Sequence, residues 1–446
     1  MDTLTAARAQ MEVSLAFHII FAALGIGLPL LMVIAEGLYL RTGREHYRAL
    51  ARKWVKATAL TFAVGAVSGT ALSFELGLLW PRFMALAGGV VGPAFALEGY
   101  AFFLEAIFIG LYLYGWDRLS PRAHWLTGIP VAVAGALSGV LVVAANSWMQ
   151  TPGDFQQVAG RLVAVNALAP FRTPSWPDMA LHSTLSSYIA TCFAVAGVYA
   201  TGMLRGRRDA YHRSALGIAL ALGVVAAVLQ PLSGDVSARR VARTQPMKLA
   251  AAEALFHTQR RAPLVIGGIP DVGAERVRLG IEVPAGLSFL ATHDLNAEVK
   301  GLDAVPADAR PNVVVTHFAF QTMVGFGLLL IAGGLVYWLV RLRRPERAER
   351  RGVLWPLVLL SPLGMLALEA GWFVTEVGRQ PWVIYGTMRT GSGVTPVAQV
   401  PLTFVGFTVL YVLLGAALVV LLRRLATGGD DQAAAGEAAA EVSGVA

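Results

Sequence analysis

The chain alternates long runs of apolar residues with short polar connections. A helix that crosses a bilayer needs about 20 predominantly apolar residues, and nine stretches of this chain reach that length. Continuous apolar runs of this length favour helices over strands, whose apolar positions alternate or form short runs. We therefore predict an all-α polytopic membrane protein. The predicted spans are residues 13–36, 54–79, 93–115, 125–147, 179–204, 214–233, 312–340, 352–377 and 398–422.

The positive charges follow the connections on one side of the predicted bundle. Short loops near the cytoplasmic face carry an excess of Lys and Arg, so these basic connections predict which side is cytoplasmic. We predict an N-terminus outside and a C-terminus in the cytoplasm, consistent with an odd number of spans. The basic connections are residues 41–53, 116–122, 205–213, 341–351 and 421–424.

One connection is far longer than the others and lies on the predicted outer face. It covers residues 234–311 between the sixth and seventh spans. Long loops of this kind are often functional, and the apolar patterning at 246–257 and 286–303 predicts that this one is partly ordered. The chain thus divides into spans one to six (1–233), an outer loop (234–311) and spans seven to nine (312–425). The low-complexity tail, 426–446, is predicted to be disordered and cytoplasmic.

Composition excludes several classes of protein. Only 14% of the residues are charged and 56% are hydrophobic, whereas soluble domains are about 25% charged. The single cysteine, Cys192, excludes an internal disulfide and a cysteine-rich metal or iron–sulfur site. The net charge of +8 lies mostly in the short loops, so it signals topology and no nucleic-acid partner is expected.

Ionisable and ligating side chains lie inside the predicted spans, where they are costly and usually functional. Glu98 and Glu105 are spaced to share one helical face. Buried carboxylates are also typical of a proton or ion transporter without redox chemistry, so that function stays an alternative. Histidine nitrogen and methionine sulfur, however, are axial haem ligands. The full set is His18, Glu75, Glu98, Glu105, His182, His317, Met323, Glu369 and Glu376.

Two other haem-protein classes fit the histidines poorly. A cytochrome b of the quinol–cytochrome c type needs paired histidines along one helix, and no such pairs occur. A haem–copper oxidase needs more span histidines than His18, His182 and His317 provide. The remaining histidines are predicted to lie in loops. They are His46, His124, His212, His257 and His293.

Several ordered motifs resemble subunit I of the cytochrome bd quinol oxidases, in the branch with a short quinol loop. The resemblance runs from the first span to the ninth. The motifs that carry it are GWFVTEVGRQPW (371–382), QPMKLAAAEALFHT (245–258), FALEGYAFFLEAIF with GWDRL (95–119), NSWMQTP (146–152), PDMALHS (177–183), LSFLAT with AEVKGLD (287–303) and FQTMVG (320–325).

This resemblance implies a respiratory enzyme of the prokaryotic cytoplasmic membrane that oxidises membrane quinol and reduces O2 to water. It implies proton uptake from the cytoplasm, and hence a contribution to the proton-motive force. The implied cofactors are a low-spin haem b, a high-spin haem b and a haem d or third haem b, without copper. The implied partners are the lipid bilayer, a subunit II and often a small single-span subunit.

The resemblance also assigns roles to span residues. His182 and Met323 would be the axial ligands of the low-spin haem. His18 and Glu376 would serve the two high-spin haems, and which residue ligates which haem stays open. Glu98 would lie at the haem d site as a ligand or proton donor. Together with Glu105, which has a helix-pairing role as its alternative, it would carry protons.

Further roles concern the haem surroundings and the outer loop. Trp372 is expected between haems and Arg379 beside a propionate, both on one helical face with Glu369 and Glu376. Lys248 and Glu253 are expected to bind the quinol head group and accept its protons. The alternatives are a solvated surface helix and a non-quinol electron donor.

The chain departs from the family pattern at Gln321, where well-studied members of the family have an arginine. The departure leaves the potential of the low-spin haem open. Nearby His317 is expected either to compensate or to be a polar residue at the outer membrane interface.

Overall fold

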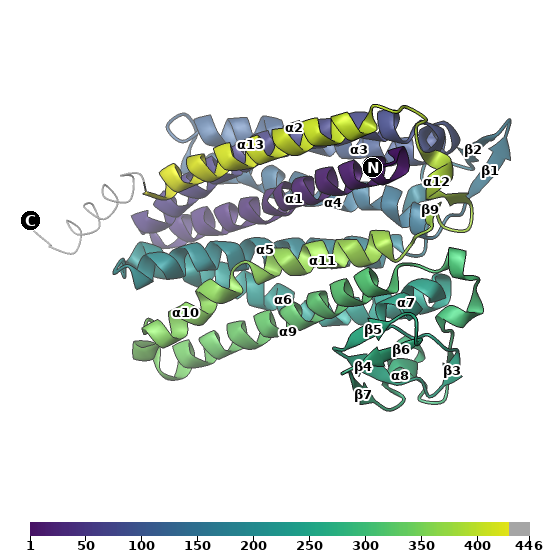
Figure 1. Ribbon diagram of the computed structural model, residues 1–446. Helices are drawn as coiled ribbons and strands as arrows, with labels where there is room; N and C mark the ends of the chain where they lie inside the picture. The colour runs from purple at the N-terminus through teal and green to yellow at the C-terminus, as the bar shows by residue number, and fades with distance from the viewer. Residues whose placement is uncertain (428–446) are drawn as a thin grey trace, which may run out of the picture.

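The computed structural model describes residues 1–427 and is built almost entirely from long helices (Figure 1). Among these residues, nine helical segments are long and apolar enough to cross a membrane, which confirms the predicted number. They are α1 (Thr3–Thr42), α2 (Glu45–Leu79), α3 (Pro81–Tyr114), α4 (Pro121–Gln150), α5 (Trp176–Leu204), α6 (Ala210–Thr244), α9 (Val313–Arg343), α10 (Arg351–Leu360) joined to α11 (Leu363–Val377), and α13 (Val400–Thr427). The predicted tail at 426–446 lies almost wholly outside the described residues.

Most helices extend beyond the predicted spans because their ends are polar. The clearest case is α6, predicted to end at 233 but helical to Thr244. Its last turns carry charges that are paired, such as Arg240, whose Nε lies 2.6 Å from Asp178 Oδ1. The outer loop therefore starts at the end of this extension, and not at 234 as predicted.

The eighth span is broken into α10 and α11 at Ser361 and Pro362. Proline lacks a backbone N–H and its ring crowds the preceding turn, so a helix usually ends before it. The break gives α11 its own direction, and α11 carries Glu369, Trp372 and Glu376.

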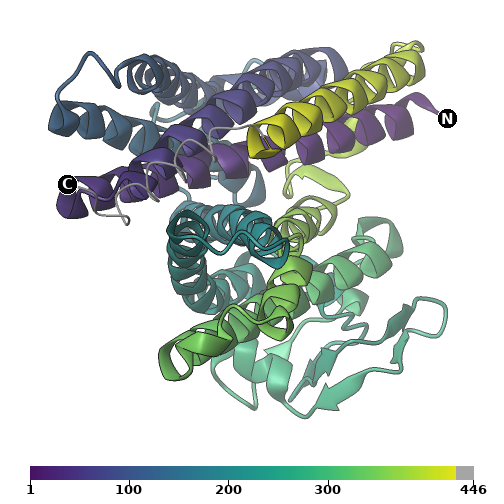
Figure 2. The same ribbon diagram turned by 90° about the vertical axis from the view of Figure 1, so that its left-hand side faces the viewer.

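The helices form two bundles. In the first, α1, α2, α3 and α4 pack around one another and α13 covers α1 and α2. In the second, α5 contacts α6 and α11, and α9 closes the ring against both. The bundles meet where α5 packs on α1 and α4 (Figure 2).

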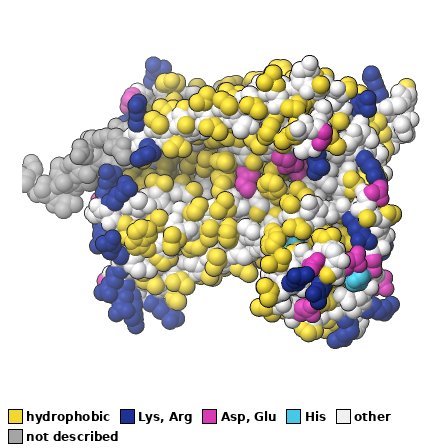
Figure 3. All heavy atoms as spheres, viewed as in Figure 1, with side chains coloured by type: hydrophobic (Ala, Val, Ile, Leu, Met, Phe, Trp, Pro, Cys, Tyr) yellow, Lys and Arg dark blue, Asp and Glu magenta, His cyan; other side chains and the backbone are white. Residues whose placement is uncertain are grey.

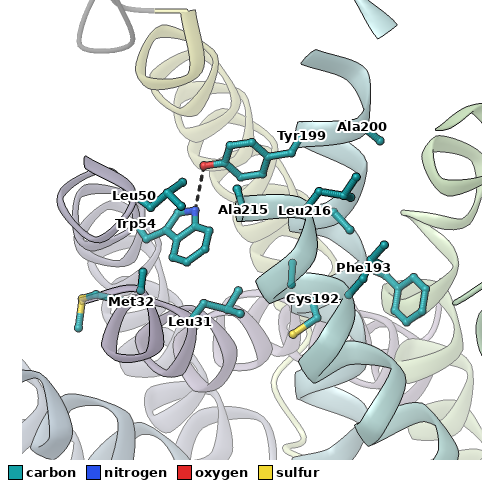
Figure 4. Packing of buried hydrophobic residues seen from close by; sticks show 14 of the residues in the cluster. Leu31, Met32, Leu50, Trp54, Cys192, Phe193, Tyr199, Ala200, Ala215 and Leu216 are labelled. Atoms are coloured by element: carbon teal, nitrogen blue, oxygen red, sulfur yellow. Dashed lines mark hydrogen bonds between the residues drawn. The ribbon is translucent and has the colours of Figure 1, made fainter. Parts of the chain in front are cut away.

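A hydrophobic core joins the bundles where α1, α2, α5 and α6 meet (Figure 4). Leu31 and Phe193 are almost fully buried there. Trp54 donates a hydrogen bond from its indole nitrogen to Tyr199 Oη at 3.0 Å, because a buried aromatic side chain with a polar atom needs a partner.

The outer loop is ordered, as predicted, but it also holds strands that were not predicted. Two short helices, α7 (Pro246–Ala252) and α8 (Gly286–Thr292), coincide with its two apolar stretches. Three antiparallel strand pairs lie around them: β3 (Gln259–Arg260) with β8 (Glu298–Val299), β4 (Leu264–Ile266) with β7 (Ile281–Val283), and β5 (Ile269–Asp271) with β6 (Arg276–Arg278).

The remaining short elements lie between the long helices. They are the hairpin of β1 (Phe155–Val158) and β2 (Arg161–Ala164), the pair β9 (Trp382–Ile384) and β10 (Met388–Arg389), helix α12 (Thr390–Gly393), and the 3-10 turns η1 (Ala169–Arg172), η2 (Leu302–Ala304), η3 (Ala307–Ala309) and η4 (Pro345–Arg347).

Lys and Arg side chains gather at the end of the bundle opposite the ordered loop (Figure 3). The N-terminus lies toward the loop end and α13 finishes at the basic end (Figure 1). The basic connections thus share one end of the bundle (Figure 3), the end that we predict to be cytoplasmic.

The predicted loop position of three histidines is wrong. His46 lies in α2, His124 in α4 and His212 in α6. Span limits drawn from apolar residues leave out the first helical turn, where these residues lie. His124 is buried, with Nδ1 at 2.6 Å from Glu36 Oε1.

Close packing between the bundles predicts that Gly27→Val destabilises the protein. A Cβ at position 27 would lie 2.4 Å from the Thr191 side chain on α5, and overpacking of this kind costs about 1–3 kcal/mol. Thermal unfolding of the purified protein should show a lower midpoint. Gly110→Ala, which adds a methyl group where nothing lies within 4 Å, is the control, and an equal loss in both variants would contradict the packing explanation.

Candidate functional site

His18 lies on α1 with its ring fixed from one side. Its Nδ1 lies 2.9 Å from Ser68 Oγ on α2, and no other side chain in residues 1–427 forms a hydrogen bond to its Nε2. Gly69 faces the ring edge, where a Cβ would lie 3.0 Å from His18 Cε1. A histidine whose second nitrogen is held in this way is oriented as metal-ligating histidines usually are.

His182 on α5 repeats this arrangement in the second bundle. Its Nδ1 lies 2.8 Å from Ser233 Oγ on α6, and Gln230 donates to its backbone carbonyl at 3.2 Å. Within the described chain, no hydrogen bond engages Nε2. Gly234 again faces the ring, with a Cβ position 3.6 Å from Cε1.

Met323 lies on α9 and points toward α11. A Cβ at position 371 would lie 2.9 Å from Met323 Sδ, so the glycine of the GWF motif makes room for the thioether. Helices α9 and α11 belong to the same ring as α5. The structure therefore places His182 and Met323 in one four-helix bundle.

Glu376 lies near the end of α11, where the two bundles meet. Its Oε1 accepts a hydrogen bond from Asn146 Nδ2 on α4 at 2.7 Å, and its Oε2 accepts one from the Arg379 guanidinium. Arg379 lies beyond the end of α11, so it is not part of the helical face predicted for it. Its Nη1 is buried without a partner in the described residues.

Glu98 and Glu105 lie on α3 inside the first bundle. Ser138 on α4 donates to Glu98 Oε1 at 3.0 Å. Glu105 Oε1 is buried and has no hydrogen bond within residues 1–427. Gly135 leaves room for it, since a Cβ there would lie 3.1 Å from this oxygen. A helix-pairing role for Glu105 would need a hydrogen bond from this oxygen to a neighbouring helix, and the described residues provide none.

Glu369 and Trp372 lie one turn apart on α11. Both carboxylate oxygens of Glu369 are buried and unpaired among the described side chains. The Trp372 ring contacts Phe373 edge-on, with centroids 5.1 Å apart. Acidic side chains are visible in a hollow between α13 and α11, on an otherwise apolar face (Figure 3).

Lys248 on α7 and Glu253 at its end are buried, with exposed fractions of 6% and 4%. The solvated surface helix considered as an alternative is therefore wrong. Burial, and next the charge of Arg379, lowers the pKa of Lys248 to about 7. Burial raises the pKa of Glu253 to about 8. Lys248 donates to Gln150 Oε1, while Glu253 Oε2 has no partner in the described part of the chain.

His317 and Gln321 on α9 hold the outer loop. His317 is fully buried. Its ring nitrogens lie 2.9 Å from the Ala252 carbonyl and 3.2 Å from the Gly267 carbonyl. Gln321 donates to the Val265 carbonyl at 2.9 Å and accepts from the Gly267 N–H at 3.0 Å.

The sequence did not single out several residues of this region. Ser68 and Ser233 contact histidines on other helices, and no local pattern reveals such a pairing. Asn146 and Gln150 lie in the NSWMQTP motif, which was noted only for its resemblance. Glu12, just before the predicted first span, has a buried, unpaired Oε2 and lies close enough to Glu376 to interact electrostatically.

The donor set fits haem. Two imidazoles each have one nitrogen anchored and one unengaged, and each ring faces a glycine that leaves space beside it. A thioether lies in the same bundle as one of them. The unpaired Arg379 Nη1 offers a donor of the kind that binds a propionate.

Comparisons with known proteins point the same way. Residues 6–430 match the family described as cytochrome bd terminal oxidase subunit I. A Bacillus subtilis (strain 168) protein named putative cytochrome bd menaquinol oxidase subunit I is 40% identical over 428 residues, covering 94% of this chain and 95% of its own length. The Escherichia coli (strain K12) cytochrome bd-II ubiquinol oxidase subunit 1 is 29% identical over 474 residues, covering 90% and 92%.

A solved structure shares the fold. The bd oxidase from Geobacillus thermodenitrificans matches with a TM-score of 0.90 and 38% identity, covering 95% of this chain and 98% of that one. The shared fold and the family match therefore favour the oxidase over the transporter that the sequence left as an alternative. The chain belongs to the cytochrome bd terminal oxidase subunit I family.

Proposed function

We propose that this chain is the haem-bearing catalytic subunit of an electrogenic terminal oxidase, which oxidises membrane quinol and reduces O2 to water. Membership of the family implies quinol oxidase activity and a multi-pass position in the prokaryotic inner membrane. The observation that supports a haem-bearing role is the pair of histidines, His18 and His182. Each is held by a serine through one ring nitrogen, and its other ring nitrogen is free inside the membrane helices.

This geometry supports the following assignment of the haem sites. His182 and Met323 would hold a low-spin haem b, since both lie in the second bundle. His18 and Glu376 would serve the high-spin haem b and the haem d or third haem b, with Glu98 beside them. Bound haem supplies electron transfer and O2 binding. Arg379 would contact a propionate, and Trp372 would separate neighbouring haems.

Protons would reach the oxygen site through the first bundle. Glu105 lies two turns nearer the basic end of α3 than Glu98, on the same face. An unpaired carboxylate can take up and pass on a proton, and Ser138 orients the next carboxylate. Uptake from the basic, cytoplasmic side and quinol oxidation at the loop side would together charge the membrane.

Quinol would bind where α7 meets the outer ends of the bundles. Lys248 would donate to a quinol oxygen and Glu253 would accept a quinol proton. Burial lowers the pKa of Lys248 to about 7 and raises the pKa of Glu253 to about 8, so both groups can exchange protons in this pH range. The named relatives include a menaquinol and a ubiquinol oxidase, so the head group bound here would be that of either quinol.

The family implies a subunit II, and we propose that a small single-span subunit joins it. Helices α2 and α3 leave large apolar side chains exposed, which lipid or a membrane partner would cover. These side chains include Phe74, Leu78, Tyr100, Phe103, Leu104 and Ile107.

Replacing Met323 should remove the low-spin haem signal from the visible spectrum. Leucine has no sulfur donor, so Met323→Leu would remove one of the two side chains proposed to hold this haem, and the low-spin band should disappear from the reduced-minus-oxidised spectrum. Met203→Leu, a buried methionine of the hydrophobic core, is the control. An unchanged low-spin band in Met323→Leu would rule out this ligand assignment.

Glu253→Gln should lower quinol oxidation and remove its pH dependence. The carboxylate form of Glu253 appears as the pH rises through about 8, so the kcat/KM for quinol in the unaltered oxidase should rise in that range. The glutamine variant should lose about 10²-fold of activity and show no such rise. The exposed Glu298→Gln in the same loop should keep the unaltered profile, and a rise retained in Glu253→Gln would refute the base assignment.

Glu105→Gln should slow turnover without weakening quinol binding. An amide cannot pass on a proton, so kcat for O2 reduction should fall by about 10²-fold while the KM for quinol stays the same. Glu45→Gln at the start of α2 is the matched control. A normal kcat in Glu105→Gln would show that protons travel by another route.

A further inference from the structure

A continuous series of side-chain hydrogen bonds joins the outer loop to Glu376. Lys248 on α7 donates to Gln150 Oε1 at the end of α4. Gln150 Nε2 donates to Asn146 Oδ1 at 2.9 Å, one turn earlier on α4. Asn146 Nδ2 then donates to Glu376 Oε1 on α11 at 2.7 Å. We call these four residues the amide chain.

All the donors in the amide chain point the same way. Each amide accepts on the side of Lys248 and donates on the side of Glu376, so the two dipoles align head to tail between the Lys248 amine, which is charged below its pKa of about 7, and the Glu376 carboxylate. Aligned hydrogen bonds polarise one another, and the effect is larger where water is excluded. Lys248 and Gln150 are buried, with exposed fractions of 6% and 2%.

Two further bonds fix Gln150 in this position. Its backbone carbonyl accepts from Gln245 Nε2 at 2.7 Å, and its Nε2 lies 3.4 Å from the Thr375 carbonyl, a weaker second acceptor on α11. Gln150 therefore contacts the start of the loop, the end of α4 and the end of α11.

Amide side chains neither gain nor lose protons near neutral pH, so this chain is unsuited to proton transfer. It can transmit the electric field of the Lys248 charge. We propose that Gln150 is a positioning residue that couples Lys248 at the donor site to Glu376 at the oxygen site, through aligned amide dipoles. The inference rests on the proposed function for the identity of those two sites.

The test is a double-mutant cycle on the oxidase complex purified with its partner subunit. The variants are Gln150→Leu, Lys248→Met and the two combined. The readout is the midpoint potential of the high-spin haems, from a redox titration followed by visible absorbance. Each single variant should lower the potential, because each removes positive polarisation near Glu376. The double variant should shift it no further than the larger single shift, since coupled residues are not additive.

Additive shifts, or an unchanged potential in Gln150→Leu, would overturn the proposal. Gln10→Leu, which removes a buried amide that donates to Glu75 at 3.0 Å, is the matched control and should leave the potential unchanged. Should Gln150→Leu fail to assemble, Gln150→Met, with an unbranched side chain of similar length, takes its place.

The KM for quinol, measured on the same samples, separates this inference from the proposed function. A higher KM in Lys248→Met with an unchanged potential in Gln150→Leu would retain the quinol site and reject the coupling. An unchanged KM with non-additive potential shifts would support the coupling and reject the quinol site.

Discussion

The organisation of this protein depends on the cost of polar groups in a low-dielectric interior. A buried polar atom that makes no hydrogen bond is expensive, so most of the polar side chains between the helices are paired across them. Serine hydroxyls hold the two ligand-type histidines, and Asn146 and Arg379 donate hydrogen bonds to Glu376. The exceptions, such as Glu369 and Arg379 Nη1, have no hydrogen-bond partner among the described residues.

The same constraint bears on the different roles that we propose for the two bundles. The second bundle contains the His182 imidazole and the Met323 thioether, which would hold the proposed low-spin haem. The first bundle, and its border with the second, offers carboxylates with room around them, which suits proton delivery. The amide chain runs along this border, where α4 and α11 approach the loop helix α7.

Much of this arrangement could be predicted from the sequence. The nine spans follow from apolar length, and His18, His182, Met323 and the carboxylates stand out because they are exceptions to it. Span ends could not be predicted, because hydropathy does not register paired charges such as Arg240 with Asp178. The partners of the site residues could not be predicted either: nothing near Ser68 or Asn146 indicates which distant side chain it contacts. The role of His317 was missed for the same reason, since its partners are backbone carbonyls in a distant loop.

The two hydrogen bonds from Gln321 to the outer loop constrain which residues can occupy position 321. Gln321 uses its oxygen and its nitrogen at once, accepting from Gly267 and donating to Val265. An arginine at this position would have donors only and could not accept from the Gly267 N–H. The donors and acceptors of residue 321 therefore have to match those that the backbone presents at the β4–β5 turn.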